Sequence, residues 1–128
     1  MEEIRVRTGE RNALVEITAQ VEAAVRRTGV RAGIVVVQSL HTTAALTVNE
    51  NADPDVVHDV LRKMDEIVPA TERYYRHAEG NSDSHVKTSL FGPSLTLIVH
   101  DGAHSSAAGR ASTCASGTAR ARGRWRCR

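Results

Sequence analysis

The sequence feature that constrains the fold most strongly is a run of mostly apolar and β-branched residues from Gly33 to Leu40. This run is Gly-Ile-Val-Val-Val-Gln-Ser-Leu. Side chains of this kind are typical of a strand that lies inside a sheet and is covered on both faces. We therefore predict a central strand here. Other parts of the chain must then supply its neighbouring strands and the helices that cover it.

A polar segment follows this predicted strand and leads into a helix start. Residues 41–57 contain His41, three threonines, two asparagines and three carboxylates. A strand end and a helix N-terminus bring side chains and unpaired backbone N–H groups to one place, where an anion or a metal can bind. We take this junction as the first candidate functional segment.

Alternation, capping residues and helical spacing predict the elements around the central strand. Thr18 can serve as an N-cap and Gly29 as a helix stop, and Asp53 followed by Pro54 marks the start of a longer helix. The first two strands are expected to pair with each other in antiparallel fashion. The predicted strands are 4–8, 14–17, 33–40, 44–48 and 94–99, and the predicted helices are 18–28, 54–68 and 82–90.

The length of 128 residues is sufficient for one hydrophobic core but not for two, so we expect a single domain. No apolar run approaches the length that spans a membrane. The start, Met-Glu-Glu-Ile-Arg, lacks the apolar centre of a signal peptide. These features predict a cytoplasmic protein that does not have a membrane as a partner.

The C-terminal segment differs sharply from the rest of the chain. Residues 103–128 hold six arginines, both cysteines and no acidic residue, and they contain no Leu, Ile, Val, Met, Phe or Tyr. Their composition resembles that of a coding sequence translated in the wrong reading frame. A segment of this composition buries too little apolar surface to offset the conformational entropy that is lost when it becomes ordered. We therefore expect a domain over 1–102 and a disordered or aberrant tail over 103–128, without the strand that should return from the Asp101-Gly102 turn.

The arginines of the tail raise the question of nucleic-acid binding. Residues 1–102 carry 11 Lys and Arg against 15 Asp and Glu, so the predicted domain is acidic. An acidic domain repels a phosphate backbone. We therefore expect no nucleic-acid partner.

A second polar segment, residues 76–85, precedes the last predicted strand. Asn81 or Ser82 can cap a short helix there that continues to about Leu90. Imidazoles with carboxylates suit a zinc-like ion, and carboxylates with phosphate oxygens suit magnesium, whereas helix capping and solvated surface side chains are the alternative. The residues of this segment with ligand chemistry are His77, Glu79, Asp83 and His85.

Two blocks of sequence resemble a known family. One is His-Thr-Thr-Ala-Ala-Leu-Thr-Val-Asn-Glu-Asn-Ala-Asp-Pro-Asp-Val at 41–56. The other is Tyr-Arg-His-Ala-Glu-Gly-Asn-Ser-Asp-Ser-His-Val-Lys-Thr-Ser-Leu-Phe-Gly-Pro-Ser at 75–94. Over residues 1–102 the chain is similar to the YjbQ-like family of secondary thiamine-phosphate synthases. After residue 102 it lacks the family's Gly-Thr-Trp-Gln type segment.

The resemblance implies a fold, an assembly and a reaction. The fold is a single compact α+β domain with two to three helices on a mixed or antiparallel sheet, and the assembly is a homotrimer. The reaction joins a pyrimidine pyrophosphate to a thiazole phosphate to give thiamine phosphate, as a secondary activity. The expected partner is therefore a small phosphorylated substrate.

On this resemblance we hypothesise that imidazoles, acids and cations from both polar segments meet in one pocket. Arg76 and Lys87 would hold phosphate, although solvated surface cations are the alternative for each residue singly. The predicted catalytic residues are His41, Glu50, His77 and His85. The predicted ligands of a divalent metal, zinc or magnesium, are His41, His77 and His85. The predicted substrate-binding residues are Thr42, Thr43, Arg76, Asn81 and Lys87.

A second hypothesis belongs to a different class of protein. The same histidines, acids and arginines can serve a non-catalytic trimeric module that binds a metal or a small anion. The sequence pattern does not separate the two hypotheses. An assay of synthase activity together with a metal analysis separates the enzyme from the non-catalytic module.

Overall fold

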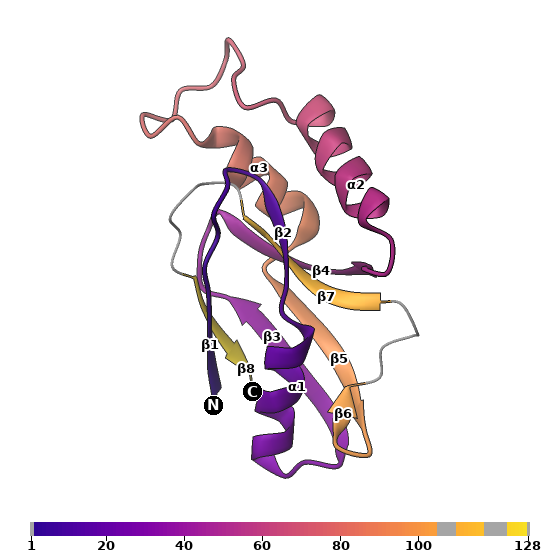
Figure 1. Ribbon diagram of the computed structural model, residues 1–128. Coiled ribbons are helices and arrows are strands. Elements are labelled where there is room, and N and C mark those ends of the chain that lie inside the picture. Colours follow the sequence, from indigo (N-terminus) through magenta and orange to yellow (C-terminus); the bar gives the residue numbers. More distant parts are fainter. Residues whose placement is uncertain (1, 105–109, 117–122, 128) are drawn as a thin grey trace.

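The computed structural model describes residues 2–104, 110–116 and 123–127, and in these ranges the chain forms two antiparallel sheets and three helices (Figure 1). This is the α+β domain that the family resemblance implies. The strands are β1 (Glu2–Val6), β2 (Ala13–Glu16), β3 (Ala32–Ser39), β4 (Ala44–Glu50), β5 (Ser94–His100), β6 (Ala103–His104), β7 (Arg110–Ser116) and β8 (Gly123–Cys127). The helices are α1 (Thr18–Thr28), α2 (Pro54–Ile67) and α3 (Ser82–Phe91).

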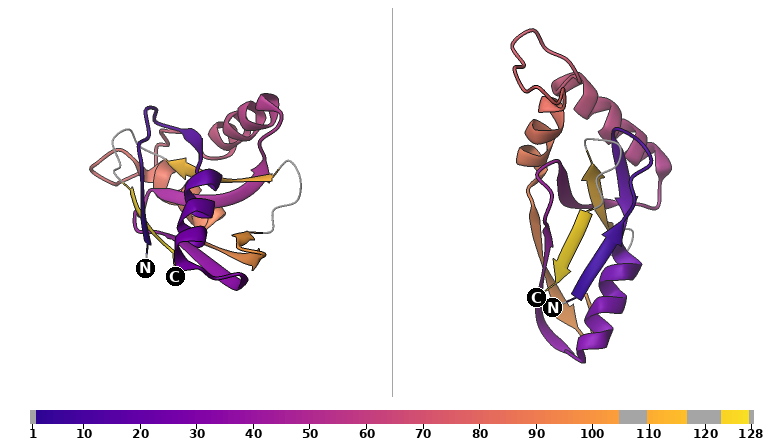
Figure 2. Two further views of the ribbon diagram at one scale, coloured as in Figure 1. Left: turned by 60° about the horizontal axis from the view of Figure 1, so that its bottom comes forward. Right: turned by 90° about the vertical axis from the view of Figure 1, so that its left-hand side faces the viewer.

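The predicted central strand is confirmed as β3, which lies in the middle of a five-stranded sheet with the order β1-β8-β3-β5-β6. The prediction that both of its faces are covered is wrong for a single chain. Val35 and Val37 are buried, whereas Ile34 is 65% exposed and its partner across the sheet, Ile98, is 64% exposed. The reason is that α1 packs on one face only of this sheet (Figure 2).

The hydrophobic core lies between α1, the inner face of the five-stranded sheet and β4. Ile17, Val21 and Leu46 have no exposed surface, and burial of this apolar area supplies the main driving force for folding. Alternate residues of the strands point into this core, as the twofold repeat of a strand requires. The core residues are Ile4, Val6, Ile17, Val21, Ala24, Val25, Val35, Val37, Ala44, Leu46 and Val99.

The second sheet has three strands in the order β2-β7-β4. The predicted pairing of the first two strands is therefore wrong, because β1 pairs with β8 and β2 pairs with β7. The connection between β1 and β2, residues 7–12, carries the chain from one sheet to the other. Local alternation predicts that both segments are strands, but it contains no information about partners that lie a hundred residues away.

Three parts of the C-terminal segment, β6, β7 and β8, are strands. β7 lies between β2 and β4, and β8 lies between β1 and β3. Strand pairing uses backbone N–H and C=O groups, so a segment with few large apolar residues can still complete a sheet. The predicted tail residues 105–109, 117–122 and 128 lie outside the described residues.

The helices begin and end close to the predicted residues. Gly29 ends α1 with a φ of 71°, as a left-handed C-cap does, but Ile17 rather than Thr18 occupies the N-cap position. At α2 the prediction is confirmed, since the Asp53 side chain accepts a hydrogen bond from the backbone N–H of Asp55. Within the described part of the chain, no helix is long and apolar enough to cross a membrane.

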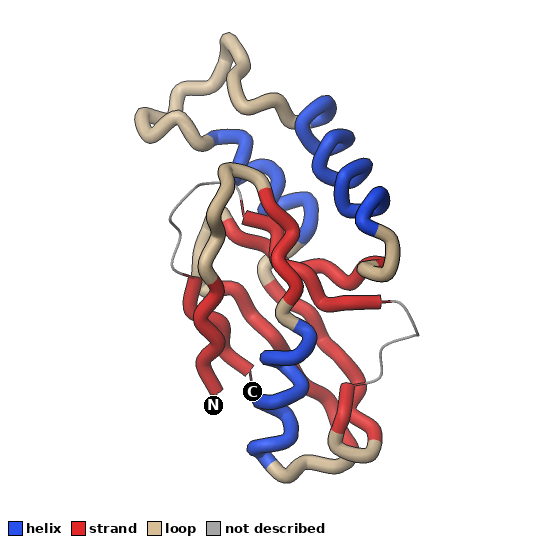
Figure 3. Tube along the Cα trace, in the orientation of Figure 1, coloured by secondary structure: helices blue, strands red, loops and turns tan. Residues whose placement is uncertain are grey.

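The second sheet carries the elements that hold the candidate site. α3 contacts β4 and β7, and α2 contacts β2. A long loop, residues 68–81, connects α2 to α3 (Figure 3). This loop and the start of α3 contain the second polar segment of the sequence.

Candidate functional site

Two of the predicted histidines meet at the start of α3. The rings of His77, on the loop, and His85, in the helix, lie 5.2 Å apart between centroids, with an angle of 77° between their planes. The Nε2 atom of His77 lies 3.7 Å from Oε2 of Glu79. The structure therefore brings two imidazoles and a carboxylate together. The spacing of these residues in the sequence could not establish this proximity.

A hollow of about 190 Å³ lies beside His77. Its wall combines a carboxylate, an imidazole, a phenol and two hydroxyl groups, which is a mixture that suits a polar ligand. The residues that line it are Ala70, Thr71, Glu72, Tyr75, His77, Gly80 and Ser82. Arg73 and Arg76 are exposed on the same loop.

Tyr75 is one of the residues that line this hollow. Its ring packs edge-on against Tyr74, with 5.1 Å between the ring centroids. Burial, followed by the negative charges of its neighbours, raises the pKa of Tyr75 above the ordinary value of 10.0. Tyr75 is therefore a protonated hydrogen-bond donor at neutral pH.

Asn81 occupies the N-cap position of α3, but its side chain does not cap the helix. Instead, its Nδ2 donates to Oε2 of Glu79 at 3.1 Å, while its backbone oxygen accepts from the N–H groups of Ser84 and His85. The Oδ1 atom of Asn81 is buried and has no hydrogen-bond partner among the described residues. Asn81 thus links the loop to the helix, and one acceptor atom remains for a donor from outside.

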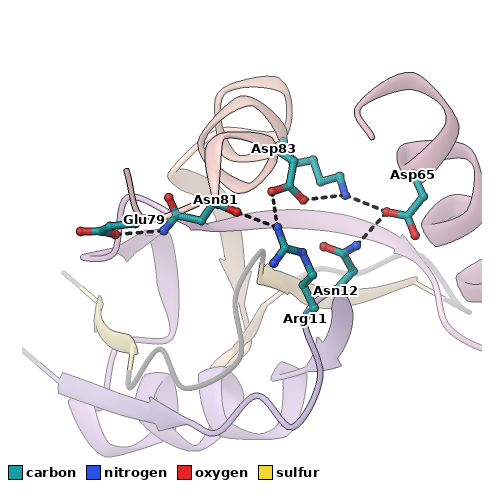
Figure 4. Close-up of polar contacts among 8 residues, drawn as sticks. Arg11, Asn12, Asp65, Glu79, Asn81 and Asp83 are labelled. Carbon is teal, nitrogen blue, oxygen red and sulfur yellow. Dashed lines mark hydrogen bonds and ion pairs between the residues drawn. The ribbon is translucent and has the colours of Figure 1, made fainter. Parts of the chain in front are cut away.

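A network of charged side chains lies under this loop and joins three elements (Figure 4). Arg11 Nη2 donates to Oδ1 of Asp83 at 2.8 Å and to the backbone oxygen of Gly80 at 3.1 Å. Lys87 Nζ lies 3.4 Å from Oδ2 of Asp83 and 2.7 Å from Oδ1 of Asp65 on α2. Asp83 is completely buried, so it depends on both of these cations.

The network gives Lys87 a different role from the one predicted for it. Its side chain is only 8% exposed and lies between two carboxylates. These carboxylates occupy two of the three donors of its ammonium group, and little of the side chain is open to a phosphate group. We therefore assign Lys87 to the support of α3 rather than to the substrate.

His41 lies in the turn between β3 and β4. Its Nδ1 atom accepts a hydrogen bond from the backbone N–H of Thr43 at 3.2 Å and lies 2.8 Å from the Thr43 hydroxyl oxygen. Because a backbone N–H can only donate, the neutral ring carries its proton on Nε2. Thr43 is buried, whereas Thr42 is exposed.

The three histidines do not form a preformed metal site within one chain. Over the described residues, no group of three His, Cys, Asp or Glu side chains could hold a metal ion. Glu50, at the exposed end of β4, accordingly does not complete a set of ligands with His77 and His85. A metal at this pair would need further ligands from a substrate or another chain.

Sequence reasoning missed Arg11, Asn12 and Asp65. Asn12 Nδ2 donates to Oδ1 of Asp65 at 2.7 Å, across 53 positions of the sequence, and Arg11 reaches Asp83 across 72. Arg11 and Asn12 look like turn residues, and Asp65 looks like a surface acid of α2. Only the pairing of distant segments identifies them, and no local signal could have done so.

Comparisons with known proteins agree with this fold. The model of the family described as UPF0047 protein YjbQ-like matches residues 2–109. The UPF0047 protein YugU of Bacillus subtilis is 42% identical over 99 residues, which cover 77% of this chain and 75% of that protein. The UPF0047 protein MJ1081 of Methanocaldococcus jannaschii is 43% identical over 98 residues, with coverage of 77% and 70%.

Solved structures extend the similarity to the whole chain. A YjbQ/UPF0047 family protein of Clostridium acetobutylicum is 34% identical, with a TM-score of 0.95 and coverage of 100% of this chain and 98% of that one. The conserved hypothetical protein TT1486 of Thermus thermophilus is 31% identical, with a TM-score of 0.92 and the same coverage. Sequence and structure together place this chain in the UPF0047 protein YjbQ-like family.

Proposed function

We propose that this chain is a small-molecule enzyme that joins a pyrimidine pyrophosphate to a thiazole phosphate, giving thiamine phosphate as a secondary activity. The reaction is the one that the sequence resemblance implies. The observation that carries the proposal is the hollow at the start of α3, with His77 on its wall and His85 packed against His77. A polar hollow with one imidazole on its wall and a second imidazole beside it suits a substrate that carries phosphate groups.

The proposed chemistry needs little covalent help from the protein. The C–O bond to pyrophosphate breaks, and pyrophosphate leaves with the electron pair. The thiazole nitrogen then forms the new C–N bond to the benzylic-type cation. Positive charge near the leaving oxygens stabilises this transition state. Arg73 and Arg76, on the same loop, can supply this charge and bind the phosphate groups, and ring N–H groups of His77 and His85 can donate hydrogen bonds to the leaving oxygens.

We propose that the site can bind zinc or magnesium, and metal analysis of the purified protein tests this. A divalent ion, when bound, would neutralise charge on the leaving pyrophosphate. His77, His85 and Glu79 offer donor atoms for it, but they do not amount to a three-ligand site among the described residues. We therefore assign no step of the reaction to a metal.

We also propose that the chain assembles as a homotrimer and acts on its small substrate in that form. The assembly comes from the resemblance, and the exposed pair Ile34 and Ile98 on the outer face of β3 and β5 supports it. Adjacent large apolar side chains on an open sheet face are typical of a surface that another chain covers. A second copy that packs on this face would bury the outer side of β3. Both faces of the strand would then be covered, as its sequence predicts.

The alternative is a non-catalytic trimeric module that binds a metal or an anion. The exposed arginines and the half-open hollow favour an anion as its ligand. This alternative predicts that inorganic pyrophosphate binds to the hollow and that no thiamine phosphate forms. The enzyme hypothesis predicts both binding and turnover.

An assay of thiamine phosphate formation tests the proposal. His77→Ala and His85→Ala should each reduce kcat/KM by at least about a hundredfold, since each removes a group that contacts the reacting phosphates. His58→Ala is the matched control, because this histidine is exposed on α2 and its side chain is 75% accessible. Unchanged turnover in both site variants, or no turnover in the wild-type chain, would contradict the enzyme hypothesis.

A further inference from the structure

Arg11 is linked to His77 through the backbone of Gly80, and to the helix that carries His85 through the side chain of Asp83. Its Nη2 atom donates to the Gly80 oxygen at 3.1 Å, and the N–H of Gly80 donates to the oxygen of His77 at 3.1 Å. The same Nη2 atom donates to Asp83, in the first turn of α3, two residues before His85. A single guanidinium group therefore holds the loop that carries His77 and the helix that carries His85.

The conformation of this loop at Gly80 depends on the hydrogen bonds that the loop makes. Its φ of 67° lies in the left-handed region, which permits the tight turn from His77 into the helix. The side chain that should cap α3, Asn81, is bonded to Glu79 instead. The start of α3 therefore lacks a side-chain cap, and Arg11, from the connection between β1 and β2, restrains it instead.

Arg11 has two roles, because it balances the charge of Asp83 and also binds the loop at Gly80. Asp83 is completely buried and retains Lys87 as a second cation at 3.4 Å if Arg11 is removed. Arg11, whose side chain is 44% exposed, is also a charge partner of Asp83, so its removal should lower the free energy of unfolding as well. Because Lys87 stays in place, a variant without the guanidinium group should still fold, at lower stability, and should lose the hydrogen bond to Gly80.

We propose that Arg11 is a positioning residue of the candidate site, which holds the loop at Gly80 and the first turn of α3 so that the His77 and His85 rings stay in contact. This inference deepens the proposed function and depends on it for its relevance to catalysis. Its structural content, the position of the two rings, can be measured without a substrate.

The test compares three variants of the full chain by hydrogen exchange and by nuclear Overhauser contacts between the two imidazole rings. Arg11→Met keeps the apolar stem and removes every donor. Arg11→Lys keeps a charge that can pair with Asp83 but lacks the planar fork. Asp65→Ala is the matched control, because it removes the bonds to Lys87 and Asn12 and leaves the loop bonds in place.

In Arg11→Met, exchange of the Gly80 amide should become at least about tenfold faster, and the contacts between the rings should be lost, because a charge-assisted hydrogen bond is removed. Arg11→Lys should recover the melting temperature but not the slow exchange of Gly80. Asp65→Ala should lower the melting temperature and leave both loop signals unchanged.

Two results would overturn the inference. One is that the ring contacts and the Gly80 exchange rate are the same in Arg11→Met as in the wild type. The other is that Asp65→Ala changes these signals as much as Arg11→Met does, which would make the effect one of general stability. Because neither readout uses turnover, an inactive wild-type chain would refute the proposed function and leave this test intact.

Discussion

At the scale of single residues, the most unusual feature is a buried carboxylate that lies between two cations. Asp83 has no exposed surface, and Lys87 beside it is almost as well covered. Charges in such a place are tolerated only when each has a partner. The two residues lie four positions apart on one face of α3, so their pairing with each other was accessible from helical spacing, but their burial was not.

Replacing Lys87 by Met should therefore destabilise the chain strongly. It leaves the carboxylate of Asp83 with Arg11 alone in a dry environment, and the expected loss in the free energy of unfolding is about 3 kcal/mol. Lys63→Met on α2 is the matched control, because Lys63 is 67% exposed and pairs with Glu66 at the surface. Surface pairs contribute less than about 1 kcal/mol. Urea unfolding measures both, and equal losses would contradict this account of the network.

At the scale of elements, the sequence predicted what is local and missed what is distant. The Asp53-Pro54 start of α2 and the Gly29 end of α1 were correct, because each depends on a few neighbouring residues. The partners of β1 and β2 were not, since they come from the opposite end of the chain. For the same reason the sequence put forward His77 and His85 as candidate site residues but not Arg11.

The cap of α2 gives a prediction at this scale. None of the residues of α2 is fully buried, so the helix depends on its own ends more than α1 does. Asp53→Ala removes the acceptor for the Asp55 N–H and should lower the free energy of unfolding by about 1 kcal/mol. Asp59→Ala, an exposed acid within the same helix, should have a smaller effect in the same denaturant titration. A reversed order would show that the cap is not what holds this helix end.

At the scale of the whole molecule, the open face of β3 and β5 is the feature that a single chain does not explain. Ile34 and Ile98 lie opposite each other in the sheet and are each about two thirds exposed. The sequence of β3 predicted cover on both faces, and one chain provides it on one face only. The homotrimer would supply the missing cover, although the sequence pattern by itself does not give the number of copies.

Ile34→Lys tests whether this face joins the copies. A charge placed between apolar surfaces opposes association, so light scattering after gel filtration should change from the mass of three chains to that of one. Ile67→Lys is the control, because Ile67 is an exposed apolar residue on α2, away from this sheet. Retention of the trimer in Ile34→Lys, or a monomeric wild type, would mean that the face has another role.

The central claim is that the pair of histidines at the start of α3 belongs to a site for a phosphorylated small molecule. The most direct measurement follows the ring signals of all six histidines by nuclear magnetic resonance while the pyrimidine pyrophosphate is added. The account predicts saturable shifts of the His77 and His85 signals, with His58 unchanged. Shifts confined to other histidines, or no shift at all, would contradict it.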